Sequence, residues 1–142
     1  MRYLVRARLK RGKADSLLGA VESGALGRGS IAHDEFLRCM AEARLTEAGQ
    51  VRWLEVCYCR EAFGPGYELA EELPYWREYF EEIDIRFARR LDGCDGYPHC
   101  GDCDCTVKLE AKLAKLGGPF LKTLRRALGG GKRPRALPAA RG

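Results

Sequence analysis

Apolar residues recur with alternating strand-like and helix-like spacing between residues 3 and 91. Residues 3–9 place apolar side chains at every second position, which predicts a strand with one buried side. Residues 14–24 have the spacing of a helix that stops near Gly24. Residues 31–40 show a weaker helical pattern, and its expected inward positions are Ile31, Leu37 and Met40.

The second half of this region repeats the alternation. Two β-rich runs, residues 42–46 and 51–59, flank a short polar turn and are predicted to form a hairpin. Residues 60–68 are expected to form a loop, and Pro74 suits the first turn of a helix. That helix carries an apolar stripe, expected to be core or dimer interface: Tyr75, Trp76, Tyr79, Phe80 and Ile83. A last strand, ending near Leu91, is expected to turn three apolar side chains inward: Ile83, Ile85 and Phe87.

Acidic residues in and around the helix that contains Pro74 are interpreted as a solvated face: Glu71, Glu72, Glu78, Glu81 and Glu82. The whole order is then strand, helix, strand, strand, helix, strand. This is the order of a ferredoxin-like fold, so we predict an α+β protein with a four-stranded antiparallel sheet and helices on one face.

The element order, the basic turn after the first strand and the aromatic second helix resemble the dimeric α/β-barrel proteins, which are built from two ferredoxin-like sheets. The resemblance covers residues 1–91 and implies a homodimer. Some members of that superfamily are cofactor-independent oxygenases and isomerases. No catalytic residue is carried over to this chain, because the resemblance is one of fold alone.

Residues 94–106, CDGYPHCGDCDCT, hold four of the seven cysteines. An odd number of cysteines in a chain without an export signal argues against a framework of disulfides. The remaining interpretations are a metal site, a thiol redox centre, or cysteines that are merely structural. Metal binding is favoured, because clustered cysteines in a reducing compartment more often bind metal or do redox work.

The predicted ligands come from two segments. Cys57 and Cys59 are expected to share one face of a strand, with α-carbons about 6.6 Å apart, which is a poor geometry for a disulfide. In the second segment, the C-x-x-C spacing of Cys100 and Cys103 lets two sulfurs converge on one ion. The full predicted set is Cys57, Cys59, Cys94, Cys100, Cys103 and Cys105. His99 is a possible nitrogen ligand, and Cys39 is interpreted as a buried inert thiol.

Zinc is the first choice of metal, and an iron–sulfur cluster is the alternative. The favoured function is a small metal-binding protein in which the metal ties the C-terminal extension to the sheet. The competing function is a thiol- or metal-dependent redox enzyme in which Cys100 or Cys105 is reactive. The sequence has neither a nucleotide-binding nor a hydrolase motif, so it does not name a substrate.

The remainder of the chain divides into two parts. Residues 92–128 combine the cysteine-rich loop with a helical extension, interrupted at residues 117–119, that is expected to pack on the sheet domain of residues 1–91. Residues 129–142 carry four basic and no acidic residues, which account for four of the five net positive charges. This Gly/Pro-rich tail is predicted to be disordered. It is the one part expected to contact nucleic acid, although a solubilising role is favoured.

Two observations concern the compartment. The chain has no apolar run near the roughly 20 residues that a membrane helix needs. Its first residues alternate apolar side chains with arginines, unlike a signal peptide. We therefore expect a cytoplasmic protein that does not enter a membrane.

Overall fold

A computed structural model describes residues 1–88 and 104–129 of the 142-residue chain. The fold is α+β, with a five-stranded antiparallel sheet in the order β4-β1-β3-β2-β5. The strands are β1 (Arg2–Leu9), β2 (Arg44–Leu45), β3 (Val51–Val56), β4 (Phe80–Phe87) and β5 (Gly118–Pro119). The helices are α1 (Ala14–Glu22), α2 (His33–Glu42), α3 (Cys59–Phe63), α4 (Leu73–Tyr79), α5 (Cys105–Leu113), the short 3₁₀ helix η2 (Ala114–Leu116) and α6 (Phe120–Leu128).

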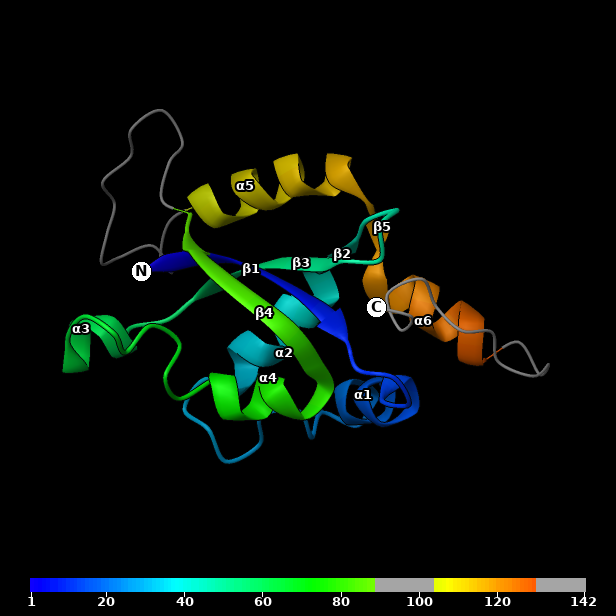
Figure 1. Cartoon of the computed structure of the whole chain (residues 1–142), viewed down its shortest axis with the longest axis horizontal. Helices are drawn as coiled ribbons and strands as arrows, with labels where there is room; N and C mark the ends of the chain where they lie inside the picture. Colours follow the sequence, from blue (N-terminus) through cyan, green and yellow to red (C-terminus); the bar gives the residue numbers. More distant parts are fainter. Residues whose placement is uncertain (89–103, 130–142) are drawn as a thin grey trace.

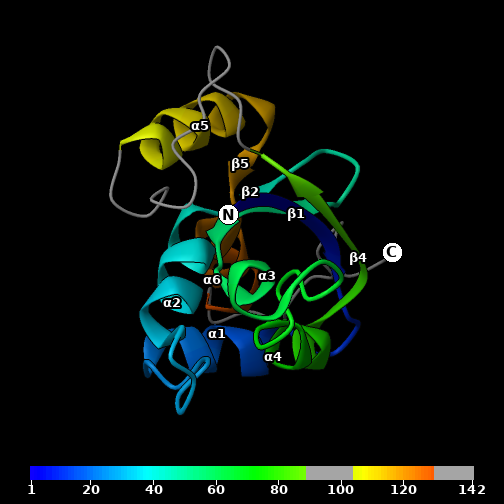
Figure 2. The same ribbon diagram turned by 90° about the vertical axis from the view of Figure 1, so that its left-hand side faces the viewer.

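The helices lie on both sides of the sheet. Helices α1, α2 and α4 lie below β1 and β3 in Figure 1, and α5 lies above them. The end-on view in Figure 2 shows the same division. Helices α1, α2 and α4, which belong to residues 1–91, lie on one face as predicted, and the helix on the other face comes from the extension. This helix, α5, packs over β3 and buries Leu54, which points away from the main core.

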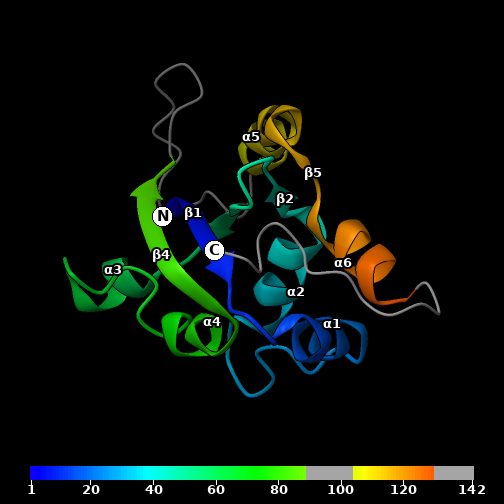
Figure 3. The ribbon, with the colours of Figure 1, turned by 45° about the vertical axis from the view of Figure 1, so that its right-hand side comes forward.

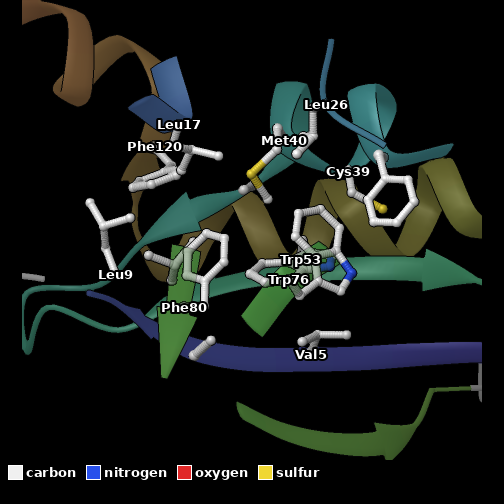
Figure 4. Packing of buried hydrophobic residues seen from close by; sticks show 14 of the residues in the cluster. Val5, Leu9, Leu17, Leu26, Cys39, Met40, Trp53, Trp76, Phe80 and Phe120 are labelled. Atoms are coloured by element: carbon white, nitrogen blue, oxygen red, sulfur yellow. The ribbon is translucent and has the colours of Figure 1, made fainter. Parts of the chain in front are cut away.

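The main core fills the space between the sheet and helices α1, α2 and α4. The inward side chains of β1 are fully buried, as the alternation predicted: Tyr3, Val5, Ala7 and Leu9. Figure 4 shows Trp53, Trp76 and Phe80 packed together, near the labelled side chains of Val5 and Met40. The ring centroids of Trp53 and Trp76 are 4.8 Å apart, and those of Trp53 and Phe80 are 5.0 Å apart. The aromatic stripe is thus confirmed as core at Trp76 and Phe80.

The fifth strand comes from the extension. Gly118 and Pro119 pair with Leu45 and Arg44 of β2, at one end of the sheet. A side chain at Gly117 would collide with the Leu45 carbonyl, so this approach requires glycine. Figure 3 follows the chain from α5 through β5 to α6. The predicted interruption at residues 117–119 is therefore confirmed, and it is the point at which the extension joins the sheet.

Helix α6 places its apolar side chains in the main core. Phe120 and Leu124 are fully buried there, and α6 contacts α1 and α2. The predicted tail falls almost entirely outside the described residues, and the boundary between residues 1–91 and 92–128 stays a prediction.

Two predicted inward positions are wrong. Ile31 is 96% exposed, because α2 begins only at His33 and Ile31 lies in the preceding turn, where helical spacing does not apply. Phe87 is 53% exposed. It lies opposite Tyr3 near the end of β4, which is the end strand of the sheet order. The Arg60 guanidinium lies over the Phe87 ring, 5.5 Å from its centroid.

Two segments near the site also differ from the predicted ones. Strand β3 ends at Val56, so the expected strand over residues 51–59 is three residues too long. Residues 59–63 form α3 where a loop was expected. Within residues 1–88 and 104–129, no helix has the length and apolar character needed to cross a bilayer.

Candidate metal centre

Three buried side chains converge where β3 gives way to α3. They are Cys57, Cys59 and Glu72, with exposed fractions of 2%, 9% and 4%. One donor atom from each lies within 4.8 Å of the other two. Two sulfurs and a carboxylate oxygen form a donor set that zinc accepts.

Cys57 is held by the start of β1. Its backbone N–H donates to the Met1 carbonyl over 3.0 Å, and the Met1 nitrogen donates to the Cys57 carbonyl over 2.9 Å. The chain then turns at Tyr58, and the Cys59 N–H donates to the Cys57 sulfur over 3.3 Å. This turn places both thiols within reach of the same Glu72 oxygen.

Glu72 enters the site from the turn before α4. Leu69 is fully buried, and its φ of 55° places it in the left-handed region that non-glycine residues rarely adopt. The Leu69 carbonyl accepts the N–H groups of Glu72 and Leu73 over 3.1 and 2.8 Å. Glu72 therefore caps α4 from a fixed position, and its Oε1 lies 3.3 Å from the Cys57 sulfur and 3.5 Å from the Cys59 sulfur.

Burial controls the protonation of the two thiols. It raises the pKa of Cys57 well above the ordinary range of a thiol, and it raises the pKa of Cys59 as well. In the metal-free protein both thiols are therefore protonated and donate to Glu72. A bound cation would take the place of these protons, because a coordinating thiol is deprotonated outright.

A second carboxyl lies deeper in the core. Glu55 is fully buried, and its Oε1 accepts the indole N–H groups of Trp53 and Trp76, each over 2.9 Å. Burial, with smaller contributions from Glu72 and Glu35, raises its pKa to about 8. Glu55 is thus a protonated group behind the three donors at neutral pH.

A cavity of about 430 Å³ adjoins two of the three donors. Cys57 and Glu72 line it, together with Glu35, Arg38 and Glu110. Glu35 accepts from the Val56 N–H over 2.7 Å and from Arg38 over 2.7 and 2.9 Å. Arg38 also forms an ion pair with Glu110 of α5. The cavity therefore lies between α2, α5 and the end of β3.

The sequence-predicted ligands fall into three groups. Cys57 and Cys59 are brought together, although by a turn rather than by a strand face. Cys105 is the first residue of α5, as expected, and is not a member of the three-residue group. Cys94, His99, Cys100 and Cys103 lie outside the described residues. Cys39 is fully buried, and its thiol donates to the Leu54 carbonyl over 3.4 Å, in agreement with the expected buried thiol.

Sequence reasoning missed Glu72, because it was interpreted as part of a solvated face. A signal was nevertheless present, since Glu72 lies four residues before Trp76 and thus on the same helical face as a core residue. An acidic residue on the buried stripe indicates a buried carboxylate with a partner.

Comparisons of the chain with protein-family models, with curated proteins and with solved structures found no match.

Proposed function

We propose that this protein binds a zinc ion through Cys57, Cys59 and Glu72. The observation that carries the proposal is the convergence of three buried donor atoms within 4.8 Å of one another. The three residues come from the turn after β3, the start of α3 and the cap of α4. A metal ion at this point would tie the end of the sheet to the start of α4.

Zinc is favoured over an iron–sulfur cluster by the donor set. Carboxylate oxygen is an ordinary zinc ligand, whereas iron–sulfur clusters are held by thiolates, with histidine as the variant. An iron–sulfur cluster would need further cysteines. Cys94, Cys100, Cys103 and Cys105 stay predictions as additional ligands that would anchor the extension.

The competing proposal is a thiol redox enzyme. The short distance from the Cys59 N–H to the Cys57 sulfur is compatible with a reactive pair. A reactive cysteine, however, normally lies in an exposed, electropositive place that favours its thiolate. Cys57 and Cys59 are buried beside a carboxylate, so the surroundings of this pair support metal binding better. The reactivity of Cys100 or Cys105 stays a prediction.

We also propose a ferredoxin-like sheet to which β5 has been added, and a homodimer. The ferredoxin-like sheet is supported by the sheet order β4-β1-β3-β2 and by the chain order of β1, α1, β2, β3, α4 and β4, into which α2 and α3 are inserted. The homodimer is supported by β4, which has eight residues, forms one end of the sheet order and carries the exposed Phe87. A long strand at the end of a sheet offers backbone groups for pairing with another chain.

Metal analysis of tag-free protein purified under reducing conditions tests the zinc proposal. We expect about one zinc per chain in the wild type, and loss of most of it in Cys57→Ser, because a thiolate ligand is removed. Cys39→Ser is the matched control, since Cys39 is also buried but belongs to no donor group. Metal-free wild-type protein with all thiols free and a melting temperature unaffected by added zinc would contradict the proposal.

A further inference from the structure

We propose that the metal at Cys57, Cys59 and Glu72 takes an exogenous ligand from the adjoining cavity, and that this ligand is an amine or imidazole with an apolar body. The inference rests on the proposed function, because it assigns a partner to the same metal. It makes the centre a ligand-binding site rather than a closed structural one.

The position of the cavity gives the first argument. A zinc ion with three protein ligands keeps a fourth position for water or substrate. Within the described residues, the donor group has three members. Two of them, Cys57 and Glu72, form part of the cavity wall, whereas Cys59 does not. An ion held by all three donors therefore has its remaining position on the cavity side.

The charge of the cavity wall is the second argument, and it indicates which class of ligand can bind. Among the described residues of the lining, Arg38 is the one basic side chain, and it is already paired with both Glu35 and Glu110. The summed negative charge of two thiolates and the Glu72 carboxylate is larger than the positive charge of a divalent ion. The site thus stays negative when it is loaded. An anionic ligand is repelled, and a neutral nitrogen donor is not.

The rim of the cavity gives the third argument. Three apolar or aromatic side chains of the lining are exposed, namely Ile31, Tyr58 and Val107. Ile31 lies just before α2 and Val107 lies in α5, and these two helices flank the same end of the sheet in Figure 2. Exposed apolar side chains around a polar interior suit a ligand that places its polar head inside and covers the rim with its apolar body.

Cobalt substitution provides the test, because Co²⁺ in place of zinc has an absorption spectrum that reports its ligands. Sulfur-to-cobalt bands on loading would establish the metal site itself. We expect imidazole to change the visible cobalt bands in a saturable way. We expect 4-phenylimidazole to bind roughly tenfold tighter, because its ring buries rim surface. We expect azide to leave the visible cobalt bands unchanged at the concentration at which imidazole saturates the site.

Two variants test whether the apolar residues of the cavity rim contribute to binding. The double variant Ile31→Ala, Val107→Ala should bind imidazole like the wild type and should lose most of the advantage of 4-phenylimidazole. Leu116→Ala, which changes another exposed apolar residue of the extension, is the control and should leave both affinities unchanged.

The outcomes separate the two proposals. Sulfur-to-cobalt bands that imidazole does not alter would overturn this inference and leave the metal site standing. Azide binding as tightly as imidazole would overturn the assigned class of ligand. The absence of sulfur-to-cobalt bands would overturn both proposals.

Discussion

At the scale of the residue, Glu55 links stability to pH. Its carboxyl has a pKa of about 8 in the fold against an ordinary value of 4.5. The folded protein therefore keeps a proton that the unfolded chain releases, and the free energy of unfolding falls as pH rises between these two values. The full shift corresponds to a loss on the order of 5 kcal/mol. We predict that Glu55→Gln, which stays neutral, removes most of this fall in the metal-free protein.

Denaturant unfolding at about pH 5 and pH 8 measures this effect. The glutamine side chain of this variant can still accept both indole N–H groups through its single amide oxygen, so the fold should survive the change. Glu78→Gln, at an exposed position of α4, is the control and should follow the wild type. An unchanged dependence on pH in Glu55→Gln would show that Glu55 is not the group responsible.

At the scale of the element, the contact between α2 and α5 depends on Arg38. This residue pairs with Glu35 on its own helix and with Glu110, which is buried in α5. Arg38→Met would leave Glu110 buried without its partner, so we predict a loss of about 2 kcal/mol in the free energy of unfolding. Arg125→Met removes an exposed pair with Glu22 and should cost less than about 1 kcal/mol.

Hydrogen exchange can locate the loss of stability that we expect in Arg38→Met. Protection should fall chiefly in α5 in Arg38→Met, because α5 loses its ionic contact with α2 while the main core keeps its apolar packing. Equal losses of stability in the two arginine variants, without a local change in α5, would contradict this account of the extension.

At the scale of the whole molecule, the homodimer stays a prediction. An apolar sheet face exposed to water is unfavourable, and α5 covers part of the second face of the sheet within the chain. The outer side of β4, which pairs with no strand among residues 1–88 and 104–129, is then the surface at which a second copy is expected. Light scattering at high micromolar concentration should give roughly twice the monomer mass, and a mass of 15.9 kDa would contradict the prediction.

Parts of this molecule could be predicted from local patterns. Alternation at Tyr3 and Val5 located β1, and helical spacing located α1, because each pattern reports one buried side of one element. Strand β5 could not be predicted, because two residues, Gly118 and Pro119, carry no pattern and pair only through the fold. The two-residue spacing of Cys57 and Cys59 likewise allowed the prediction that their side chains lie together. The approach of Glu72 could not be predicted, because it depends on the turn at the buried Leu69.

X-ray absorption at the zinc edge of the purified wild-type protein tests the central claim most directly. Binding by Cys57, Cys59 and Glu72 predicts a mixed coordination shell, with two sulfurs at about 2.3 Å and at least one oxygen or nitrogen at about 2.0–2.2 Å. A shell of four sulfurs with neither oxygen nor nitrogen would contradict the claim, because it would place Glu72 outside the metal centre.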